Sequence, residues 1–196
     1  MTCIVGMVDG NVVLIGSDSA ATDEFGNQEV QRDAKLFTLQ VPVAGRPEGP
    51  KGPKASMLIG FSGSFLVAQA IRWMLNVPRY RPTEPIMKYM VAHFVPAARA
   101  AVTKALGEPK DTESMFREAT FLIGFQGRLF TVESNGQIME SLHGYASVGA
   151  GSSTALGAMW ASGSRDAWTV LEDGLHAAEY FCSTVRGPFH IEYAMK

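Results

Sequence analysis

The chain has 196 residues, of which 46 % are apolar and 18 % are charged, and its net charge is −2. This composition predicts a single globular domain over residues 1–196 and excludes a disordered chain. The basic residues are scattered, which argues against nucleic acid as a partner, and no apolar run approaches the ~20 residues of a membrane span.

The cysteines and histidines show no ligand pattern. Cys3 and Cys182 are the two cysteines, and they are not spaced from each other or from the four histidines as a zinc site requires. We therefore expect no metal and no cofactor. With no visible signal peptide and too few cysteines for a disulfide framework, we expect a cytoplasmic protein.

The chain opens with two apolar runs, residues 2–8 and 12–17, on either side of Asp9-Gly10-Asn11. Asp-Gly is a strong signal for a tight hairpin turn, because glycine accepts the positive φ that the turn needs. Both runs are almost continuously apolar, which is typical of strands buried on both faces. Such a strand would hold Thr2 in the interior, where a neighbouring base makes a threonine hydroxyl a nucleophile.

A polar stretch, 23–32, leads to a predicted strand at 34–41 with Lys35 at its start. The next segment, 42–54, contains four prolines and three glycines and is expected to form a surface loop.

A short buried strand is predicted at 57–61, followed by two helices. The first presents apolar residues at helical spacing: Phe65, Ala68, Ile71 and Leu75. The second is expected to have Thr83 as its N-cap and a kink at Pro96. Its apolar positions are Ile86, Met90, Phe94, Ala97 and Ala101.

The second half of the chain again shows predicted strands followed by predicted helices. Hairpin strands are predicted at 119–125 and 128–133, with a further short strand at 137–139. The glycine-rich segment 148–157 leads into a helix that ends near Gly163. Asp166 is expected to cap the last long helix, and a final strand is predicted at 189–193. The inward positions expected on that last helix are Trp168, Leu171, Leu175, Ala178 and Cys182.

Strands, a helix pair, strands, a helix pair and a last strand predict an α+β fold. Two mostly antiparallel sheets would bury each other and carry helices on their outer faces, which gives a four-layer α-β-β-α sandwich.

Several familiar enzyme motifs are absent from the sequence. There is no G-x-S-x-G nucleophile elbow and no phosphate-binding G-x-x-x-x-G-K-[ST], and Gly149-Ala150-Gly151 is too short for a dinucleotide fingerprint. Taken singly, Asp18 could end a strand and Lys35 could be a solvated strand start.

Taken together, these segments are similar to those of the proteasome β-subunit family of N-terminal-nucleophile (Ntn) hydrolases. The likeness is closest to simple bacterial members such as the HslV peptidase. It rests on Met1-Thr2 before a buried strand, the segment 16–22 (GSDSAAT), Lys35 before the third strand, the segment 60–64 (GFSGS) and the segment 148–158 (VGAGSSTALGA). The family has the four-layer sandwich.

The resemblance assigns catalytic roles to four residues. Loss of Met1 would free the α-amine of Thr2, whose usual pKa of about 7.7–8.0 suits a general base, and Thr2 would attack the scissile carbonyl. Lys35 would place a positive charge beside Thr2, and Asp18 would keep Lys35 charged. Gly63 would donate its backbone N–H to the oxyanion.

The resemblance also implies a peptide-binding groove. Thr22 and Gly63 would hold the substrate as an added strand. The residues expected to bind substrate, most of them around the primary specificity pocket, are Ala21, Thr22, Asp33, Phe61 and Phe65.

Three features depart from the family pattern. Lys35 lies one residue further from Thr2 than is usual. Ala150 stands where the family commonly has a serine that helps to handle the amine proton, and Ser152 is the candidate to replace it. The segment 179–183 (EYFCS) matches the family's Asp-x-x-Ser element only approximately.

The resemblance implies a threonine peptidase that acts on peptides or unfolded proteins inside a homo-oligomeric ring, with an ATP-dependent unfoldase as a possible partner. Two alternatives are an Ntn amidase for small acyl-amides and a non-catalytic ring or scaffold subunit. Cys3 could serve as an N-terminal nucleophile only if Thr2 were also removed, and we expect it to be a buried strand residue.

Overall fold

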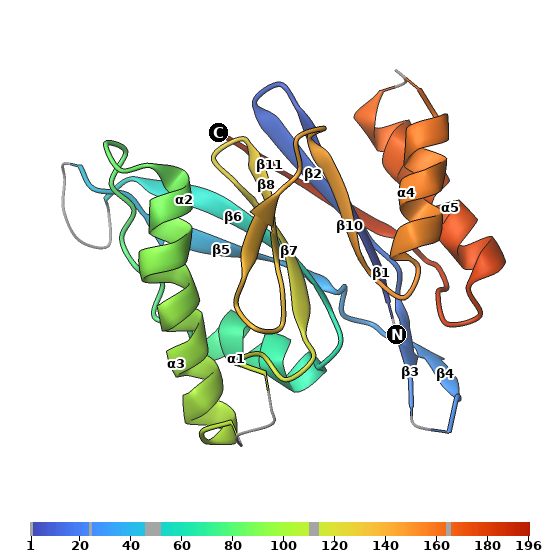
Figure 1. The fold of residues 1–196 in the computed structure, drawn as a ribbon, viewed down its shortest axis with the longest axis horizontal. Helices are drawn as coiled ribbons and strands as arrows, with labels where there is room; N and C mark the ends of the chain where they lie inside the picture. Colours follow the sequence, from blue (N-terminus) through green and yellow to red (C-terminus); the bar gives the residue numbers. More distant parts are fainter. Residues whose placement is uncertain (1, 24, 46–51, 110–113, 164–165) are drawn as a thin grey trace.

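The computed structural model describes residues 2–23, 25–45, 52–109, 114–163 and 166–196. Two antiparallel sheets pack face to face, and helices cover the outer face of each (Figure 1). The α+β class and the four-layer α-β-β-α sandwich predicted from the sequence are therefore confirmed.

The first sheet has the strand order β10-β1-β2-β11. Its strands are β1 (Cys3–Asp9), β2 (Val12–Ser17), β10 (Tyr145–Gly149) and β11 (His190–Met195). Along β1, Cys3 and Val5 pack toward the helices, while Ile4 packs against the other sheet. Both faces of the opening strand are buried, as its continuous apolar run predicts.

The second sheet has the order β5-β6-β7-β8-β9. Its strands are β5 (Leu36–Pro42), β6 (Lys54–Ser62), β7 (Thr120–Phe125), β8 (Arg128–Val132) and β9 (Ile138–Glu140). Lys35 lies just before β5 and not within it, and β6 is longer than the predicted strand. Residues 46–51 of the expected surface loop lie outside the described residues.

Helices α4 (Ser152–Ala161) and α5 (Ala167–Phe181) cover the first sheet (Figure 1). Asp166 caps α5 as predicted, because its Oδ1 accepts a hydrogen bond from Thr169 N at 3.0 Å. Trp168 was expected to point inward, but it is 44 % exposed. The cap places Ala167 on the buried face, which turns Trp168 outward, and Cys182 lies beyond the end of the helix.

The other sheet is covered by α1 (Phe65–Met74) and by α2 (Ile86–Tyr89), η1 (Met90–Phe94) and α3 (Val95–Leu106), which run on continuously. The predicted Thr83 cap is wrong, because the helix begins only after Pro85. The residue before a proline is disfavoured in helical backbone. The expected kink at Pro96 is instead a π-helical turn just before it, in which Val95 N donates to Met90 O.

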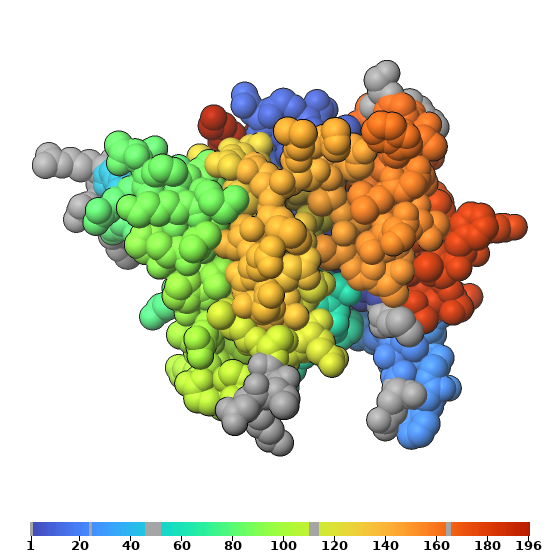
Figure 2. Space-filling model, in the orientation of Figure 1, coloured from blue at the N-terminus to red at the C-terminus, as the bar shows by residue number. Residues whose placement is uncertain are grey.

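A small hairpin, β3 (Ala20–Thr22) and β4 (Gln28–Val30), was not predicted. Its strands, Ala-Ala-Thr and Gln-Glu-Val, are too short for an apolar alternation to be recognised. Asp23 turns the chain by accepting hydrogen bonds from Phe25 N and Asn27 N at 2.9 and 2.8 Å. The hairpin projects from the body of the molecule near the chain's start (Figures 1 and 2).

No described helix has the length and apolar character needed to cross a bilayer. Between the sheets lies an aliphatic layer formed by Ile4, Val13, Ile15, Leu36, Leu58, Leu122, Leu129, Val148 and Ala194.

Gly60 provides a test of this inter-sheet packing. A Cβ at Gly60 would lie 2.5 Å from Ile4 Cγ2 and 3.1 Å from Ile15 Cγ2, so Gly60→Ala must push β6 away from β1. We expect it to lower the free energy of unfolding by about 1–3 kcal/mol in urea denaturation.

The matched control is Gly157→Ala in α4, where a Cβ would meet nothing within 4 Å. Alanine favours helix over glycine by up to about 1 kcal/mol, so this variant should be more stable than the parent. Equal effects of the two substitutions would contradict tight packing at Gly60.

Candidate active site

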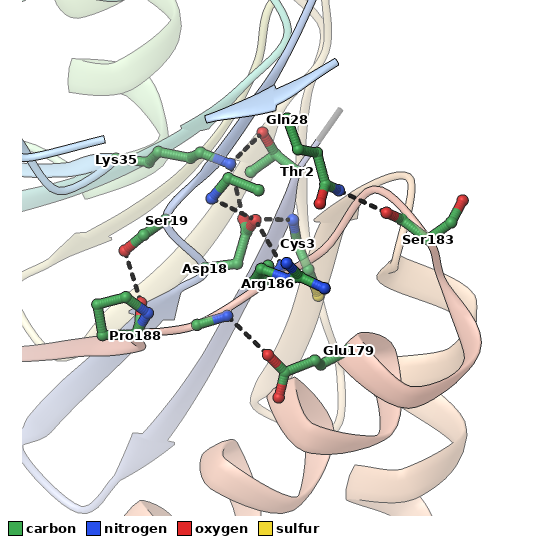
Figure 3. A network of polar contacts seen from close by, with 12 residues as sticks. Thr2, Cys3, Asp18, Ser19, Gln28, Lys35, Glu179, Ser183, Arg186 and Pro188 are labelled. Atoms are coloured by element: carbon green, nitrogen blue, oxygen red, sulfur yellow. Dashed lines mark hydrogen bonds and ion pairs between the residues drawn. The ribbon is translucent and has the colours of Figure 1, made fainter. Parts of the chain in front are cut away.

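Lys35 joins Thr2 to Asp18 in the interior (Figure 3). Its Nζ donates hydrogen bonds to Thr2 Oγ1 at 2.9 Å and to Asp18 Oδ1 at 2.8 Å. Lys35 and Asp18 are fully buried, and Thr2 is 2 % exposed. The structure thus brings together three side chains from the chain's start, the end of β2 and the start of β5.

Asp18 is held by the backbone around it. Its Oδ1 also accepts a hydrogen bond from Cys3 N at 3.0 Å, and its Oδ2 accepts from Ala20 N at 3.1 Å and Arg186 N at 3.4 Å. Three amides and one ammonium therefore stabilise the carboxylate, and such charge-assisted bonds are stronger than neutral ones.

The loop that precedes β11 is hydrogen-bonded to this network. Glu179 Oε1 accepts a hydrogen bond from Gly187 N at 2.8 Å (Figure 3). Ser19 N donates to Arg186 O at 2.9 Å. Glu179 belongs to the element that matched the family only approximately. Its contact fixes the loop that presents Arg186 N to Asp18.

Burial lowers the pKa of Lys35 below its usual value of 10.5, because desolvation disfavours the ammonium. The negative charge and the hydrogen bond of Asp18 act in the opposite direction. Asp18 thus favours the charged lysine, which polarises the Thr2 hydroxyl.

The Thr2 carbonyl is enclosed by the turn after β10. Gly151 N donates to Thr2 O at 3.3 Å, and a Cβ at Gly149 would lie 2.2 Å from the same oxygen. Gly149 has φ +97°, so both conformation and space require glycine there. The turn fixes the backbone of Thr2 from the side opposite β2.

Gly63 follows β6 with φ +90°, and a Cβ there would lie 2.4 Å from Glu118 O. Arg117 and Glu118 are themselves left-handed, with φ 44° and 69°. A Cβ placed on Gly149 would lie 2.2 Å from Thr2 O and 2.8 Å from Oγ of Ser62, the residue before Gly63. Gly63 therefore follows a residue that lies close to Thr2.

The predicted substrate residues divide between two hollows. Asp33, Phe61 and Phe65 line one cavity. Ala21 and Thr22 line the other, and Phe65 borders both. The Phe61 and Phe65 rings meet edge to face, with centroids 5.2 Å apart. Thr22 Oγ1 is buried and has no hydrogen-bond partner among the described residues.

Sequence reasoning missed part of the first cavity, which is also lined by Phe37, Gln69, Arg72 and Trp73. A signal was present, because 65, 69 and 72 lie on one helical face and Phe37 follows Lys35 by the two-residue period of a strand.

The Ala150 departure leaves a turn without a side-chain hydroxyl. Ala150 O accepts a weak hydrogen bond from Cys182 Sγ at 3.8 Å, and Ser152 begins α4. Cys3 is a buried strand residue, and burial raises the pKa of its thiol to about 12. In the described part of the chain, no three histidine, cysteine or carboxylate side chains are grouped as metal ligands.

The sequence matches no protein-family model and no curated protein. Solved structures, however, are similar over nearly the whole chain. BPH from Thiobacillus denitrificans is 20 % identical with a TM-score of 0.73, and the match covers 99 % of this chain and 98 % of that chain. BPH is also known in complex with epoxomicin.

HslV from Trypanosoma brucei is 15 % identical with a TM-score of 0.67, and both chains are covered completely. Anbu from Pseudomonas aeruginosa, described as a helical assembly, is 12 % identical with a TM-score of 0.70, covering 100 % of this chain and 81 % of that chain. These likenesses confirm the proteasome-like fold that the resemblance implied.

A double-mutant cycle tests the buried pair. Asp18→Ala leaves the Lys35 ammonium buried without its carboxylate, which should cost about 3–5 kcal/mol of unfolding free energy in urea denaturation. With Lys35→Met as the second change, the double variant should lose less than the sum of the two single losses.

The comparison pair is Arg99 and Glu108, whose charged groups lie 3.8 Å apart on the surface. Exposed pairs contribute little, so the Arg99→Gln and Glu108→Gln losses should be small and their coupling below about 1 kcal/mol. Additive losses at Asp18 and Lys35 would show that the two side chains are not coupled.

Proposed function

We propose that this chain is a threonine-type peptidase subunit, with Thr2 as an N-terminal nucleophile exposed by removal of Met1. The observation that carries the proposal is the buried Lys35 Nζ, 2.9 Å from Thr2 Oγ1 and 2.8 Å from Asp18 Oδ1. The shared fold of BPH and HslV supports the broader assignment to proteasome-like Ntn hydrolases. Met1 lies outside the described residues.

In the proposed reaction, the freed α-amine of Thr2 takes the hydroxyl proton, directly or through one water. Thr2 Oγ attacks the scissile carbonyl carbon, and the tetrahedral intermediate collapses to an ester as the amine product leaves with a proton. Water then hydrolyses the ester and restores Thr2. Lys35 stabilises the negative charge that develops on Oγ, and Asp18 keeps Lys35 charged and oriented.

Gly63 is the proposed oxyanion donor. A preorganised backbone N–H of this kind typically lowers the activation free energy by about 3 kcal/mol. Its left-handed backbone and the close Glu118 carbonyl hold the position without a side chain, which leaves room for a substrate backbone.

The substrate is proposed to bind as an extended strand along β3. The hydroxyl of Thr22 lies there, buried and without a hydrogen-bond partner among the described residues. Side chains of the substrate would then enter the two hollows on either side of Phe65.

Ser152 is proposed to take part in handling the amine proton in place of the serine that Ala150 lacks. The whole chain is proposed to act as one Ntn domain in the cytoplasm and to assemble into a homo-oligomeric ring that encloses its active sites. An ATP-dependent unfoldase would deliver unfolded proteins to such a ring.

Covalent labelling tests the nucleophile. Incubation with an epoxyketone-type or β-lactone electrophile should add one adduct per subunit, located on Thr2 by intact mass and peptide mapping. Thr2→Ala should give no adduct, and Thr2→Ser should still be labelled because it keeps the hydroxyl and the amine. Lys35→Ala should slow labelling by roughly 10²-fold or more, since it removes the charge beside the nucleophile.

The same samples separate the alternatives. A chain that retains Met1 and forms no adduct would indicate the scaffold subunit and refute the peptidase. An adduct on Thr2 in a small assembly that cleaves only short acyl-amides would indicate the amidase.

A further inference from the structure

The cavity beside the site contains a charged group that the proposed chemistry does not use. Its walls are Phe37, Phe61 and Phe65, and Asp33 and Arg72 supply its two charges. It lies beside the backbone of Lys35, because Ala34 lines it and Phe61 N donates to Lys35 O at 3.1 Å. In the proposed reaction, the side chain of a substrate residue next to the cleaved bond would enter this cavity.

Arg72 lies in the cavity wall beside two aromatic rings. Its Cζ lies 4.8 Å from the centroid of the Trp73 ring and 5.9 Å from that of Phe37. These stacking contacts orient the guanidinium but leave its hydrogen-bond donors available. Within the described part of the chain, no carboxylate forms an ion pair with Arg72, so no partner neutralises its charge.

The two charges of the cavity are not equivalent. Asp33 is exposed on a bend, where solvent and salt screen it, whereas Arg72 is partly buried and its Cζ lies 5.9 Å from the centroid of the buried Phe37 ring. A charge beside low-dielectric walls acts more strongly on a bound group than one at the surface. The cavity should therefore attract an anion despite its acidic rim.

The second hollow, on the other side of Phe65, has the opposite character. It is lined by Asp23 and Glu29 and by no lysine or arginine among the described residues. An acidic side chain is therefore repelled from that hollow and directed to the one that holds Arg72.

We infer that Arg72 is a specificity residue that favours substrates with a glutamate immediately before the cleaved bond. The carboxylate would accept hydrogen bonds from the guanidinium, and the two methylenes of glutamate would pack on Phe61 and Phe65. This inference rests on the proposed peptidase function, since it names the substrate class of that site.

The test uses short N-acylated peptides that end in a fluorogenic amide and differ only in their last residue, which is Glu, Gln, Phe or Arg. The assembled protein should cleave the Glu peptide with a kcat/KM roughly tenfold or more above that of the Gln peptide, because the bond to Arg72 is charge-assisted. Arg72→Gln should make the kcat/KM values of the Glu and Gln peptides equal and should change kcat/KM of the Phe peptide less than about threefold. Arg72→Lys should keep part of the preference for the Glu peptide.

Arg99→Gln is the matched control, because it removes the same charge from the exposed face of helix α3. It should leave the Glu-to-Gln ratio unchanged. Asp33→Asn should raise the rate for the Glu peptide by about two- to threefold, since it removes a screened like charge. A parent enzyme that favours Phe or Arg, or a Glu-to-Gln ratio unaffected by Arg72→Gln, would overturn the inference.

Binding separates a failure of this inference from a failure of the proposed function. If no peptide is cleaved in a Thr2-dependent manner, the peptidase proposal fails. Fluorescence anisotropy with Thr2→Ala and labelled peptide amides ending in Glu or Gln then tests the cavity alone. Tighter binding of the Glu peptide that Arg72→Gln removes supports the inference, and equal binding of the two peptides refutes it.

Discussion

The candidate site depends on an ammonium group that is entirely removed from water. Burying an ion costs several kcal/mol, and the attraction of a counter-ion repays this only if the geometry is good and the remaining valences are satisfied. Asp18 meets that condition, because backbone amides from three parts of the chain stabilise its carboxylate while Lys35 approaches from a fourth. The positions of β1, β2 and the loop before β11 are thereby tied to one another.

A pair of this kind contributes little to folding that apolar side chains could not provide. Buried ion pairs are often neutral or unfavourable compared with well-packed hydrophobic residues of the same volume. Here the lysine also donates to the hydroxyl of Thr2. The arrangement is therefore better explained by chemistry at that hydroxyl than by the stability of the sandwich.

Much of the fold could be predicted because its signals are local. The Asp9-Gly10 turn, the continuous apolar runs and the Asp166 cap each follow from neighbouring residues. The β3–β4 hairpin could not be predicted in this way, since its three-residue strands are held by an Asx turn and by a hydrogen bond from Gln28 Nε2 to the distant Ser183 O. Helix α2 begins at Ile86 and not directly after Thr83. Pro85 disfavours helical backbone at the residue before it, and this effect outweighs the preference of threonine for the N-cap position.

The site was only partly accessible from the sequence. Thr2, Asp18 and Lys35 are polar residues at the ends of strands, but only a likeness to known proteins could place them together, since 17 and 33 residues separate the partners along the chain. The amide of Arg186 carries no sequence signal at all, because it acts through the backbone. Arg72 has one in its helical spacing from Phe65, although only the fold shows that it faces a cavity.

The contact between Gly63 and Glu118 links the site to the outer surface. Arg117 Nη2 donates to the carbonyls of Leu106 and Gly107, both at 3.2 Å, at the end of α3. The adjoining residue, Glu118, presses its own carbonyl against Gly63. The side chain of Arg117 and the carbonyl of Glu118 thus connect the last turn of α3 to the residue proposed as the oxyanion donor.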